Sequence, residues 1–513
     1  MCGSVERGSG CRCWRVAAMR TIAWFRGKDL RVRDHEPLMR AVELGEVIPL
    51  LVLEESYFGG NDHSRAFPRQ GGHPNLPPHR LQFFLDAVAS LSSELEAMGS
   101  ALVTVRGRAT EVVPRLAHEW RADAVFAQAA VEPGSRRRDG NIAGALGEKF
   151  RLFGGETVHP PGSLRTLAGK PYGVFSPFAK SWRREVSDLP AVGLPSHLSR
   201  VPEDILKYVD PLPGLSDLGI DRNPALLTAG AVPAEARLRR FLRNAGSAYK
   251  ADRDRMGIEG TSRLSADLKF GTIAPRRVWL EAKDAIGETA GGTTFENELI
   301  WREFSYSTLW DVPSIVTTPF QTDFMGFPWR DDEHGWVAWV DGLTGYPVVD
   351  ASARQLRTEG YVHNRARMVS ASFLTKDLMI DFRRGERHYL HYLTDGDLAQ
   401  NTAGWQWTAG CGCDPQPYFR IFNPVTQGER FDPDGAYVRK WIPELCNMPS
   451  EYIHHPWDAP DALLRSAGVR LGETYPRPIV DHSFARDRFL ETASQHLKRS
   501  PGSQSAPNRL QLD

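Results

Sequence analysis

The sequence predicts an N-terminal α/β domain with a Rossmann-like parallel sheet and a C-terminal all-α domain. Short apolar runs alternate with stretches of helical periodicity from Thr21 to about residue 155, which is the pattern of a parallel α/β sheet. From Glu235 to about Lys498 the strand signal fades and helical spacing dominates. Residues 185–235 are rich in Pro, Gly, Ser and Leu, and this composition over such a length predicts a crossover between the two domains.

The elements of the first domain follow from its periodicity. The apolar runs predict strands at residues 22–25, 47–53, 101–105 and 124–126. Helical spacing between these runs predicts helices at residues 38–44, 80–98 and 111–120. The dinucleotide fingerprint G-x-G-x-x-G does not follow the first strand, where Arg26-Gly27-Lys28-Asp29 stands, so nothing indicates a nicotinamide cofactor in this domain.

These patterns divide the chain into five segments. We expect a disordered extension at residues 1–18, with Met19 as an alternative start, and a disordered tail at residues 499–513. Between them we expect the α/β domain at residues 19–155, an interdomain linker at 156–235 and the helical domain at 236–498.

The amino-acid composition excludes several classes of protein. The 63 Lys and Arg residues balance 63 Asp and Glu residues, so a polyanionic partner must meet a local basic surface. No run approaches the roughly 18 apolar residues of a membrane helix. The 6 cysteines are too few for a disulfide framework, and Cys11-x-Cys13 and Cys411-x-Cys413 lack zinc-site spacing, so we expect no metal. We therefore expect a soluble protein of the reducing cytoplasm.

Two stretches early in the helical half carry candidate binding residues. After Tyr249, the run Gly260-Thr261-Ser262-Arg263-Leu264-Ser265 places hydroxyls and an Arg before a helix, which suits a phosphate, although a helix cap with a solvated Arg fits the local pattern better. Further on, Glu298, Trp301 and Arg302 share one helix face at i, i+3 and i+4. This face suits recognition, and the alternative is an amphipathic helix with a Glu298–Arg302 surface pair.

Two later stretches also carry charged and aromatic residues in patterns that core packing alone does not require. Residues 351–390 hold 8 Lys and Arg against 4 Asp and Glu, and Asn364, Arg367 and Met368 share a helix face there, so this segment is the candidate basic surface. The alternative is a solvated basic helix. The turn Asp395-Gly396-Asp397 suits acceptance of hydroxyl hydrogen bonds or a pair with Arg367. Trp405 and Trp407 point in different directions on a helix, so they are not both core residues.

Taken together, these motifs resemble the DNA photolyase/cryptochrome family, and within it the class I enzymes that repair cyclobutane pyrimidine dimers. The matching segments are residues 21–31, 259–276, 297–304, 344–356, 363–386, 395–407 and 418–445. The resemblance implies an antenna domain at 19–155 and a catalytic domain at 236–498 that binds FAD in a U-shaped pose. It also implies a monomeric, blue-light-driven carbon–carbon lyase that acts on UV-damaged DNA: excited reduced FAD passes an electron to a flipped-out dimer, the cyclobutane ring splits and the electron returns.

The resemblance also implies the roles of individual residues. It places these residues around FAD: Tyr249, Thr261, Ser262, Arg263, Leu264, Ser265, Phe295, Arg302, Arg367, Asp395, Asp397 and Asn401. It places these residues around the dimer and the DNA: Glu298, Trp301, Arg302, Asn364, Arg365, Met368, Trp407 and Arg420. Glu298 and Asn401 are the implied catalytic residues. Glu298 hydrogen-bonds the 5′ pyrimidine, and Asn401 lies near the flavin N5 without a proton to give.

The implied electron relay departs from the family pattern. Its positions are Trp405, Phe382 and Trp329, and phenylalanine is too hard to oxidise to carry a hole. We expect photoreduction of the flavin to be slow or to detour through Tyr389 or Trp336. Repair does not need this relay when the flavin is already reduced.

Other expectations leave alternatives open. Residues 126–133 lack the pattern of folate-binding relatives, so the antenna is methenyltetrahydrofolate, a deazaflavin, a second flavin or absent. The broken relay favours a cryptochrome photoreceptor as the alternative function. Asn364 after His363 argues against the third reading, a (6-4) photolyase.

Overall fold

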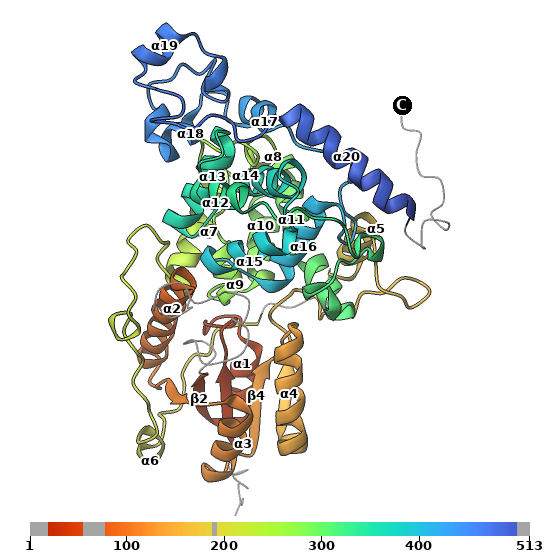
Figure 1. Cartoon of the computed structure of the whole chain (residues 1–513). Helices are drawn as coiled ribbons and strands as arrows, with labels where there is room; N and C mark the ends of the chain where they lie inside the picture. The colour runs from red at the N-terminus through yellow and green to blue at the C-terminus, as the bar shows by residue number, and fades with distance from the viewer. Residues whose placement is uncertain (1–18, 55–76, 187–191, 500–513) are drawn as a thin grey trace, which may run out of the picture.

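The computed structural model describes residues 19–54, 77–186 and 192–499, so the expectations for residues 1–18 and for the tail beyond 499 lie outside the described residues. The chain builds an α/β domain below a larger helical domain (Figure 1). The α/β domain consists of β1 (Met19–Phe25), α1 (Glu36–Leu44), β2 (Gly45–Leu53), α2 (Pro78–Ala97), β3 (Val103–Arg106), α3 (Ala109–Glu119), β4 (Ala124–Gln128), α4 (Pro133–Leu146) and β5 (Phe150–Phe153). The strands pair in parallel in the order β3-β2-β1-β4-β5, which confirms the predicted sheet.

Both faces of this sheet are covered because its strands are apolar on both sides. In β1, Ala23 and Phe25 pack with residues of α1 and α2, whereas Ile22 and Trp24 pack with residues of α3 and α4. Two elements of the α/β domain were not predicted from the sequence. Helix α4 buries only Asp139 and Ile142, and the edge strand β5 buries only Phe150, so neither shows a strong apolar period.

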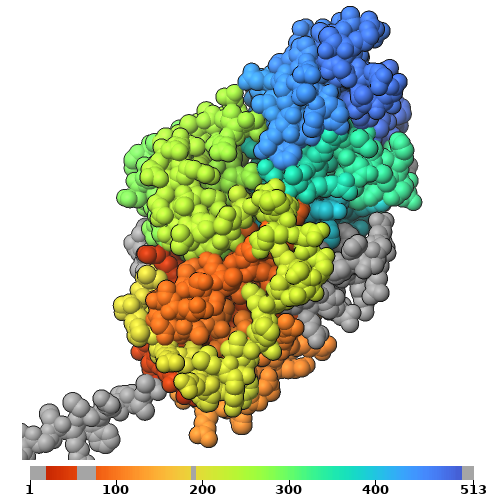
Figure 2. Space-filling view, turned by 90° about the vertical axis from the view of Figure 1, so that its left-hand side faces the viewer, coloured from red at the N-terminus to blue at the C-terminus, as the bar shows by residue number. Residues whose placement is uncertain are grey.

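The segment 156–235, predicted as a linker, contains structure of its own. Its helix α5 (Phe175–Glu185) packs Phe178 and Trp182 into the core of the helical domain. The chain then returns to the first domain, where Ile205 of α6 (Glu203–Leu206) packs beneath the sheet and Leu212 and Leu218 lie against the α2 side. Figure 2 shows this returning stretch, in yellow, running alongside the orange α2. The segment therefore packs against both domains and connects them.

The described residues after Phe153 form no β-strand, which confirms the all-helical second domain. Its helices are α7 (Ala231–Asn244), α8 (Tyr249–Asp252), α9 (Ser265–Phe270), α10 (Pro275–Ile286), α11 (Ala290–Asp311), α12 (Glu333–Asp341), α13 (Pro347–Glu359), α14 (Asn364–Ser372), α15 (Phe382–Tyr392), α16 (Leu398–Ala409), α17 (Pro424–Phe431), α18 (Ala436–Trp441), α19 (Asp461–Ser466) and α20 (His482–Arg499). Among the described helices, none combines the length and the apolarity that a bilayer crossing requires.

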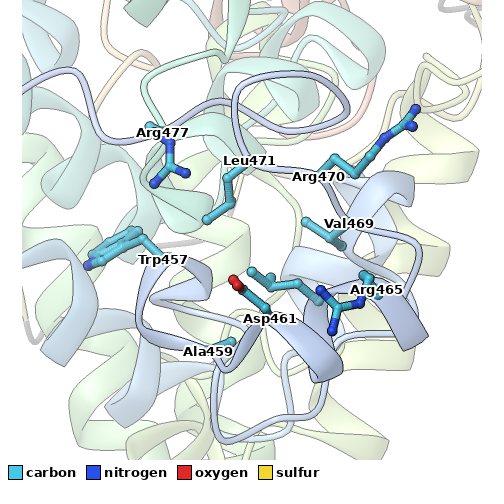
Figure 3. A pocket seen from close by; sticks show the side chains of 9 residues that line it. Trp457, Ala459, Asp461, Arg465, Val469, Arg470, Leu471 and Arg477 are labelled. Carbon is cyan, nitrogen blue, oxygen red and sulfur yellow. The ribbon is translucent and has the colours of Figure 1, made fainter.

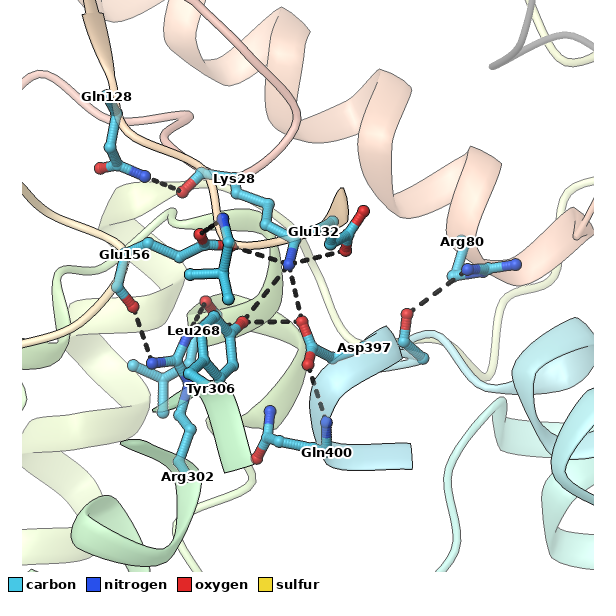
Figure 4. Close-up of polar contacts among 12 residues, drawn as sticks. Lys28, Arg80, Gln128, Glu132, Glu156, Leu268, Arg302, Tyr306, Asp397 and Gln400 are labelled. Carbon is cyan, nitrogen blue, oxygen red and sulfur yellow. Dashed lines mark hydrogen bonds and ion pairs between the residues drawn. The ribbon is translucent and has the colours of Figure 1, made fainter. Parts of the chain in front are cut away.

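A buried ion cluster joins the two domains around Lys28, in the loop after β1 (Figure 4). The Lys28 Nζ lies 2.9 Å from Glu132 and 2.8 Å from both Glu156 and Asp397. Tyr306 of α11 donates its hydroxyl to Asp397 at 2.7 Å. Burial acts to lower the pKa of Lys28, but the three carboxylates, Asp397 above all, hold it well above its usual value. The Lys28 ammonium therefore stays charged and compensates carboxylates from both domains.

Replacement of Lys28 by Met tests this cluster. It leaves the three carboxylates without their shared cation, and the loss of one partner from a buried ion group destabilises proteins by about 3 kcal/mol or more. We expect the free energy of urea unfolding to fall by that amount, while Lys170→Met, at an exposed lysine, changes it little. A Lys28→Met variant within about 0.5 kcal/mol of the parent contradicts this account.

Candidate functional site

The residues predicted to hold FAD converge from several elements of the helical domain. Tyr249 begins α8, the run 261–265 leads into α9, Arg302 lies on α11, and Arg367 lies on α14. The turn 395–397 leads into α16, on which Asn401 lies. Arg367 donates to Asp395 at 2.8 Å, which is the pair that the sequence suggested. The structure thus brings separate stretches of the chain together at one place.

The turn that contains Arg263 has an unusual backbone. Arg263 adopts a positive φ of 55°, in the left-handed region that non-glycine residues rarely occupy. Its guanidinium stacks 3.7 Å from the ring centre of Tyr361 and contacts Glu359 at 3.4 Å. Arg263 is therefore not the solvated Arg of a simple helix cap.

Several buried polar atoms at this place lack a hydrogen-bond partner within the described part of the chain. They are Nε of Arg263, Nε of Arg302 and Oδ1 of Asp395. An unsatisfied buried polar group costs about 1–3 kcal/mol, and more when it is charged. Two cationic donors and one carboxylate acceptor match the phosphates and the hydroxyls of a dinucleotide, so these residues fit FAD.

Asp397 organises the start of α16. Its side chain accepts from the backbone N–H of Gln400 at 3.1 Å and so caps the helix. Burial acts to raise the pKa of Asp397, but Lys28 and Arg302 hold it well below its usual value. Asn401, one turn further on, donates its amide to the backbone carbonyl of Glu386 at 3.0 Å. That hydrogen bond fixes the orientation of the Asn401 side chain.

Glu298 and Arg302 leave α11 toward different partners. Glu298 forms an ion pair with Arg253, and Arg302 is only 5% exposed and donates to the carbonyl of Glu156 at 2.7 Å. The alternative of a Glu298–Arg302 surface pair is therefore wrong. Because the Arg302 guanidinium also donates to Tyr306 at 3.0 Å, it is engaged at the domain interface and not available to DNA in this structure.

The ion pairs around Glu298 reach the predicted phosphate contact Arg365. Arg253 lies beside Asp254, and Asp254 binds Arg365 at 2.9 Å. Burial raises the pKa of Glu298, and Arg253 only partly opposes that rise. Sequence reasoning missed Arg253 and Asp254, because no helical or strand period relates residues 253–254 to 298 or 365.

The other residues predicted to contact the dimer lie on α14, on α16 and in the loop before α17. Asn364 and Met368 touch on α14, with 3.7 Å between the amide nitrogen and the sulfur. Trp407 is partly exposed on α16 whereas Trp405 is 4% exposed, so the prediction that they are not both core residues is confirmed. Arg420 is exposed in the loop before α17.

The basic segment 351–390 is largely compensated within the described structure. Lys376 is buried, and six of its arginines pair with carboxylates: Arg354, Arg357, Arg365, Arg367, Arg383 and Arg384. The excess charge counted from the sequence is therefore not an open basic surface, because five of the six arginines pair with acids from outside the segment, and Arg383 pairs with Asp381 inside it. A DNA phosphate must compete for these arginines.

The aromatic residues near Trp405 form a different chain from the predicted relay. The predicted members Trp329 and Phe382 contact each other, with ring centres 6.2 Å apart. The ring of Trp405 lies 5.2 Å from Tyr389 and 6.1 Å from Trp339, and Trp339 lies 5.5 Å from Trp336. Tyr389 and Trp336 were the expected detour, and Trp339 was missed.

A separate pocket lies in the C-terminal part of the helical domain (Figure 3). It has a volume of about 210 Å³ and is lined by Trp457, Ala459, Asp461, Leu464, Arg465, Val469, Arg470, Leu471 and Arg477. None of the residues predicted for FAD or the dimer lines it.

Comparison with known proteins identifies the class. The family model described as the FAD binding domain of DNA photolyase matches residues 295–495, and the model described as DNA photolyase matches residues 21–196. The deoxyribodipyrimidine photo-lyase of Agrobacterium fabrum is 40% identical over 482 residues, which are 91% of this chain and 96% of that protein. The protein of the same name from Escherichia coli is 35% identical over 484 residues, or 91% and 97% of the two chains.

Solved structures agree with these relatives. A class III photolyase from Agrobacterium tumefaciens has a TM-score of 0.83 and 37% identity, covering 95% of this chain and 100% of that one. A Synechocystis cryptochrome has a TM-score of 0.83 and 28% identity, covering 92% and 99%. The chain is thus a two-domain protein with an FAD-binding helical domain. It belongs to the DNA photolyase family.

Glu386 gives the site a pH-dependent stability. Burial raises the pKa of this carboxyl, which accepts from the Thr402 hydroxyl, to about 7. Between about pH 4.5 and 7 the unfolded chain loses a proton that the folded chain keeps, so stability falls as the pH rises, by about 3 kcal/mol at most. We expect Glu386→Gln to reduce the loss of unfolding free energy between pH 5 and pH 8. An unchanged difference between these two pH values in the variant contradicts the assignment.

Proposed function

We propose that this protein repairs cyclobutane pyrimidine dimers in DNA with the energy of blue light. The observation that carries the proposal is the chain of ion pairs Glu298–Arg253–Asp254–Arg365. Glu298 lies on α11 with Arg302, Arg365 lies on α14 with Arg367, and Arg253 and Asp254 directly follow α8. Trp301 on α11 and Trp407 on α16 are both partly exposed, as a wall for flipped-out bases requires. The names of the relatives from Agrobacterium and Escherichia support the same reaction.

FAD, when bound in its reduced form, supplies the light-excited electron donor for this reaction. The chain's own residues hold and orient it. Thr261, Ser262 and Arg263 bind its phosphates, and the Arg367–Asp395 pair and Asp397 fix its polar groups. The amide of Asn401 is held by the Glu386 carbonyl; beside the flavin it would offer no acidic proton and so would favour the anionic form.

Glu298 acts on the dimer. Its carboxyl group lies one helical turn from Trp301 on α11, and a hydrogen bond from this group to a pyrimidine carbonyl would stabilise the charge that develops there. In the DNA-free chain Arg253 occupies this carboxyl. A DNA phosphate that attracts Arg253 and Arg365 releases Glu298 for the pyrimidine, which couples DNA binding to the chemistry.

The lesion and the subclass follow from the same residues. Asn364 after His363, the two wall tryptophans and Glu298 favour the cyclobutane dimer of class I enzymes over the (6-4) photoproduct. The class III photolyase with a TM-score of 0.83 makes class III the second candidate for the subclass. The Synechocystis cryptochrome has the same TM-score at lower identity, so a photoreceptor is the alternative function.

We also propose that the protein acts as a monomer in the cytoplasm. The cysteines in the described part of the chain, Cys411, Cys413 and Cys446, are all free, as a reducing compartment requires.

Photoreduction, in this proposal, runs through the aromatic chain Trp405–Trp339–Trp336. Trp339 is buried and Trp336 is partly exposed, so the chain leads from the flavin side toward the surface. Phe382 takes no part, because phenylalanine is too hard to oxidise.

Glu298→Ala tests the repair function. We expect the quantum yield of thymine-dimer repair to fall about two- to fivefold, because a hydrogen bond to the reacting pyrimidine is lost, while bound FAD remains. Repair is measured as the light-dependent return of base absorbance in a UV-treated oligonucleotide. Repair at the parental yield contradicts the role of Glu298, and a parent without any repair contradicts the function itself.

Trp339→Phe tests the relay. We expect photoreduction of oxidised FAD by an external reductant under blue light to slow about tenfold or more, because one oxidisable ring is removed. Trp329→Phe is the matched control and should leave the rate unchanged. If Trp329→Phe slows photoreduction as much as Trp339→Phe, the proposed route is wrong.

A further inference from the structure

An aromatic residue from a distant part of the chain stacks on Trp301. The ring of Phe175, the first residue of α5, stacks on the indole of Trp301 with 3.7 Å between ring centres and an angle of 3° between ring planes. Phe304 meets Trp301 edge-on at 5.7 Å and 74°. The indole is thus held on one face and along one edge.

Phe175 is itself fixed from two sides. Its backbone N–H donates to Asp414 Oδ2 at 2.9 Å, in the loop that leads from α16 to Arg420. At the other side, Trp182 of the same helix is fully buried and donates its indole N–H to Glu303 of α11 at 2.7 Å. Helix α5 is therefore anchored by Trp182, and its first residue spans the space between α11 and the loop at 413–414.

The pair of rings is more than core packing. Phe175 and Trp301 are both partly exposed, whereas Phe178, one turn further along α5, is 2% exposed and packs on Phe304 at 5.2 Å. Phe178 and Trp182 thus provide the burial that α5 needs. An exposed parallel stack beside them restricts the rotation of Trp301, since such aromatic pairs are worth about 0.5–1.5 kcal/mol beyond their buried area.

Phe175 covers one face of the indole and Phe304 one edge, while Trp301 stays partly exposed. A binding surface that is already oriented loses less conformational freedom when its ligand arrives, and so binds more tightly. We propose that Phe175 is a positioning residue for the flipped-out dimer: it holds Trp301 in the orientation that receives the lesion. This inference rests on the proposed function, and it assigns a role in lesion recognition to the segment between the two domains.

Four single variants of the whole FAD-loaded protein and one double variant test the proposal: Phe175→Ala, Phe175→Tyr, Phe178→Leu, Trp301→Ala, and Phe175→Ala combined with Trp301→Ala. The readouts are the dissociation constants for an oligonucleotide with one thymine dimer and for the same oligonucleotide undamaged, together with bound FAD and melting temperature. We expect Phe175→Ala to weaken binding of the dimer oligonucleotide about five- to tenfold, with undamaged DNA and FAD content unchanged. Phe175→Tyr should restore the parental value, because it keeps the stacked ring.

The controls separate positioning from general loosening of α5. Phe178→Leu should lower the melting temperature and leave the dimer affinity within about twofold of the parent. In a Trp301→Ala background, Phe175→Ala should have no further effect on dimer affinity, because the residue acts through the indole. A full additional effect in that background overturns the proposal.

Three other results also overturn it. They are parental dimer affinity in Phe175→Ala, an equal loss for damaged and undamaged DNA, and an increase in dimer affinity, which would mean that the Phe175 ring competes with the lesion. Failure of the proposed function is distinguishable, because the parent itself then shows no preference for the dimer oligonucleotide and no repair in light.

Discussion

The buried ammonium of Lys28 is the interaction on which the geometry of the site depends. It is shared by Glu132 and Glu156, which follow the strands of the first domain, and by Asp397 of the second. Asp397 also caps α16, the helix of Asn401, Trp405 and Trp407. A cation in the loop after the first strand therefore fixes the start of a helix about 370 residues later, and this helix carries Asn401, which we propose lies at the flavin.

Helix α11 carries residues of the domain interface together with residues proposed to contact the flavin and the lesion. Arg302 and Tyr306 lie on the side of the ion cluster, while Glu298 and Trp301 lie toward Arg253 and Phe175. Because these residues share one rigid helix, a shift at the interface reaches the dimer side directly. The segment from α5 to α6 adds a second connection, since it packs first on α11 and then on the sheet. Residues of both domains therefore position the elements that carry the candidate site.

The sequence was sufficient for the framework of the fold and for the residue types of the site. Four strands and three helices of the first domain follow from apolar periodicity, and the suggested Arg367–Asp395 pair is present. The polar α4 and the edge strand β5 were missed because each buries few side chains. Contacts such as Arg253–Glu298 and Phe175–Trp301 join residues 45 and 126 positions apart, and no local period encodes such pairs. The net charge of residues 351–390 predicted a basic surface that the structure does not leave open, because most of the acids that pair with its arginines lie outside the segment.

The central claim is that this chain converts light into the splitting of a pyrimidine dimer. The most direct measurement is to irradiate the FAD-reduced protein with blue light in the presence of UV-treated oligo(dT), with a dark sample beside it, and to follow the ultraviolet absorbance of the bases. A rise in the light and none in the dark is the predicted result, because splitting the cyclobutane ring restores the 5,6 double bonds. No rise in the light, with FAD bound and fully reduced, contradicts the account.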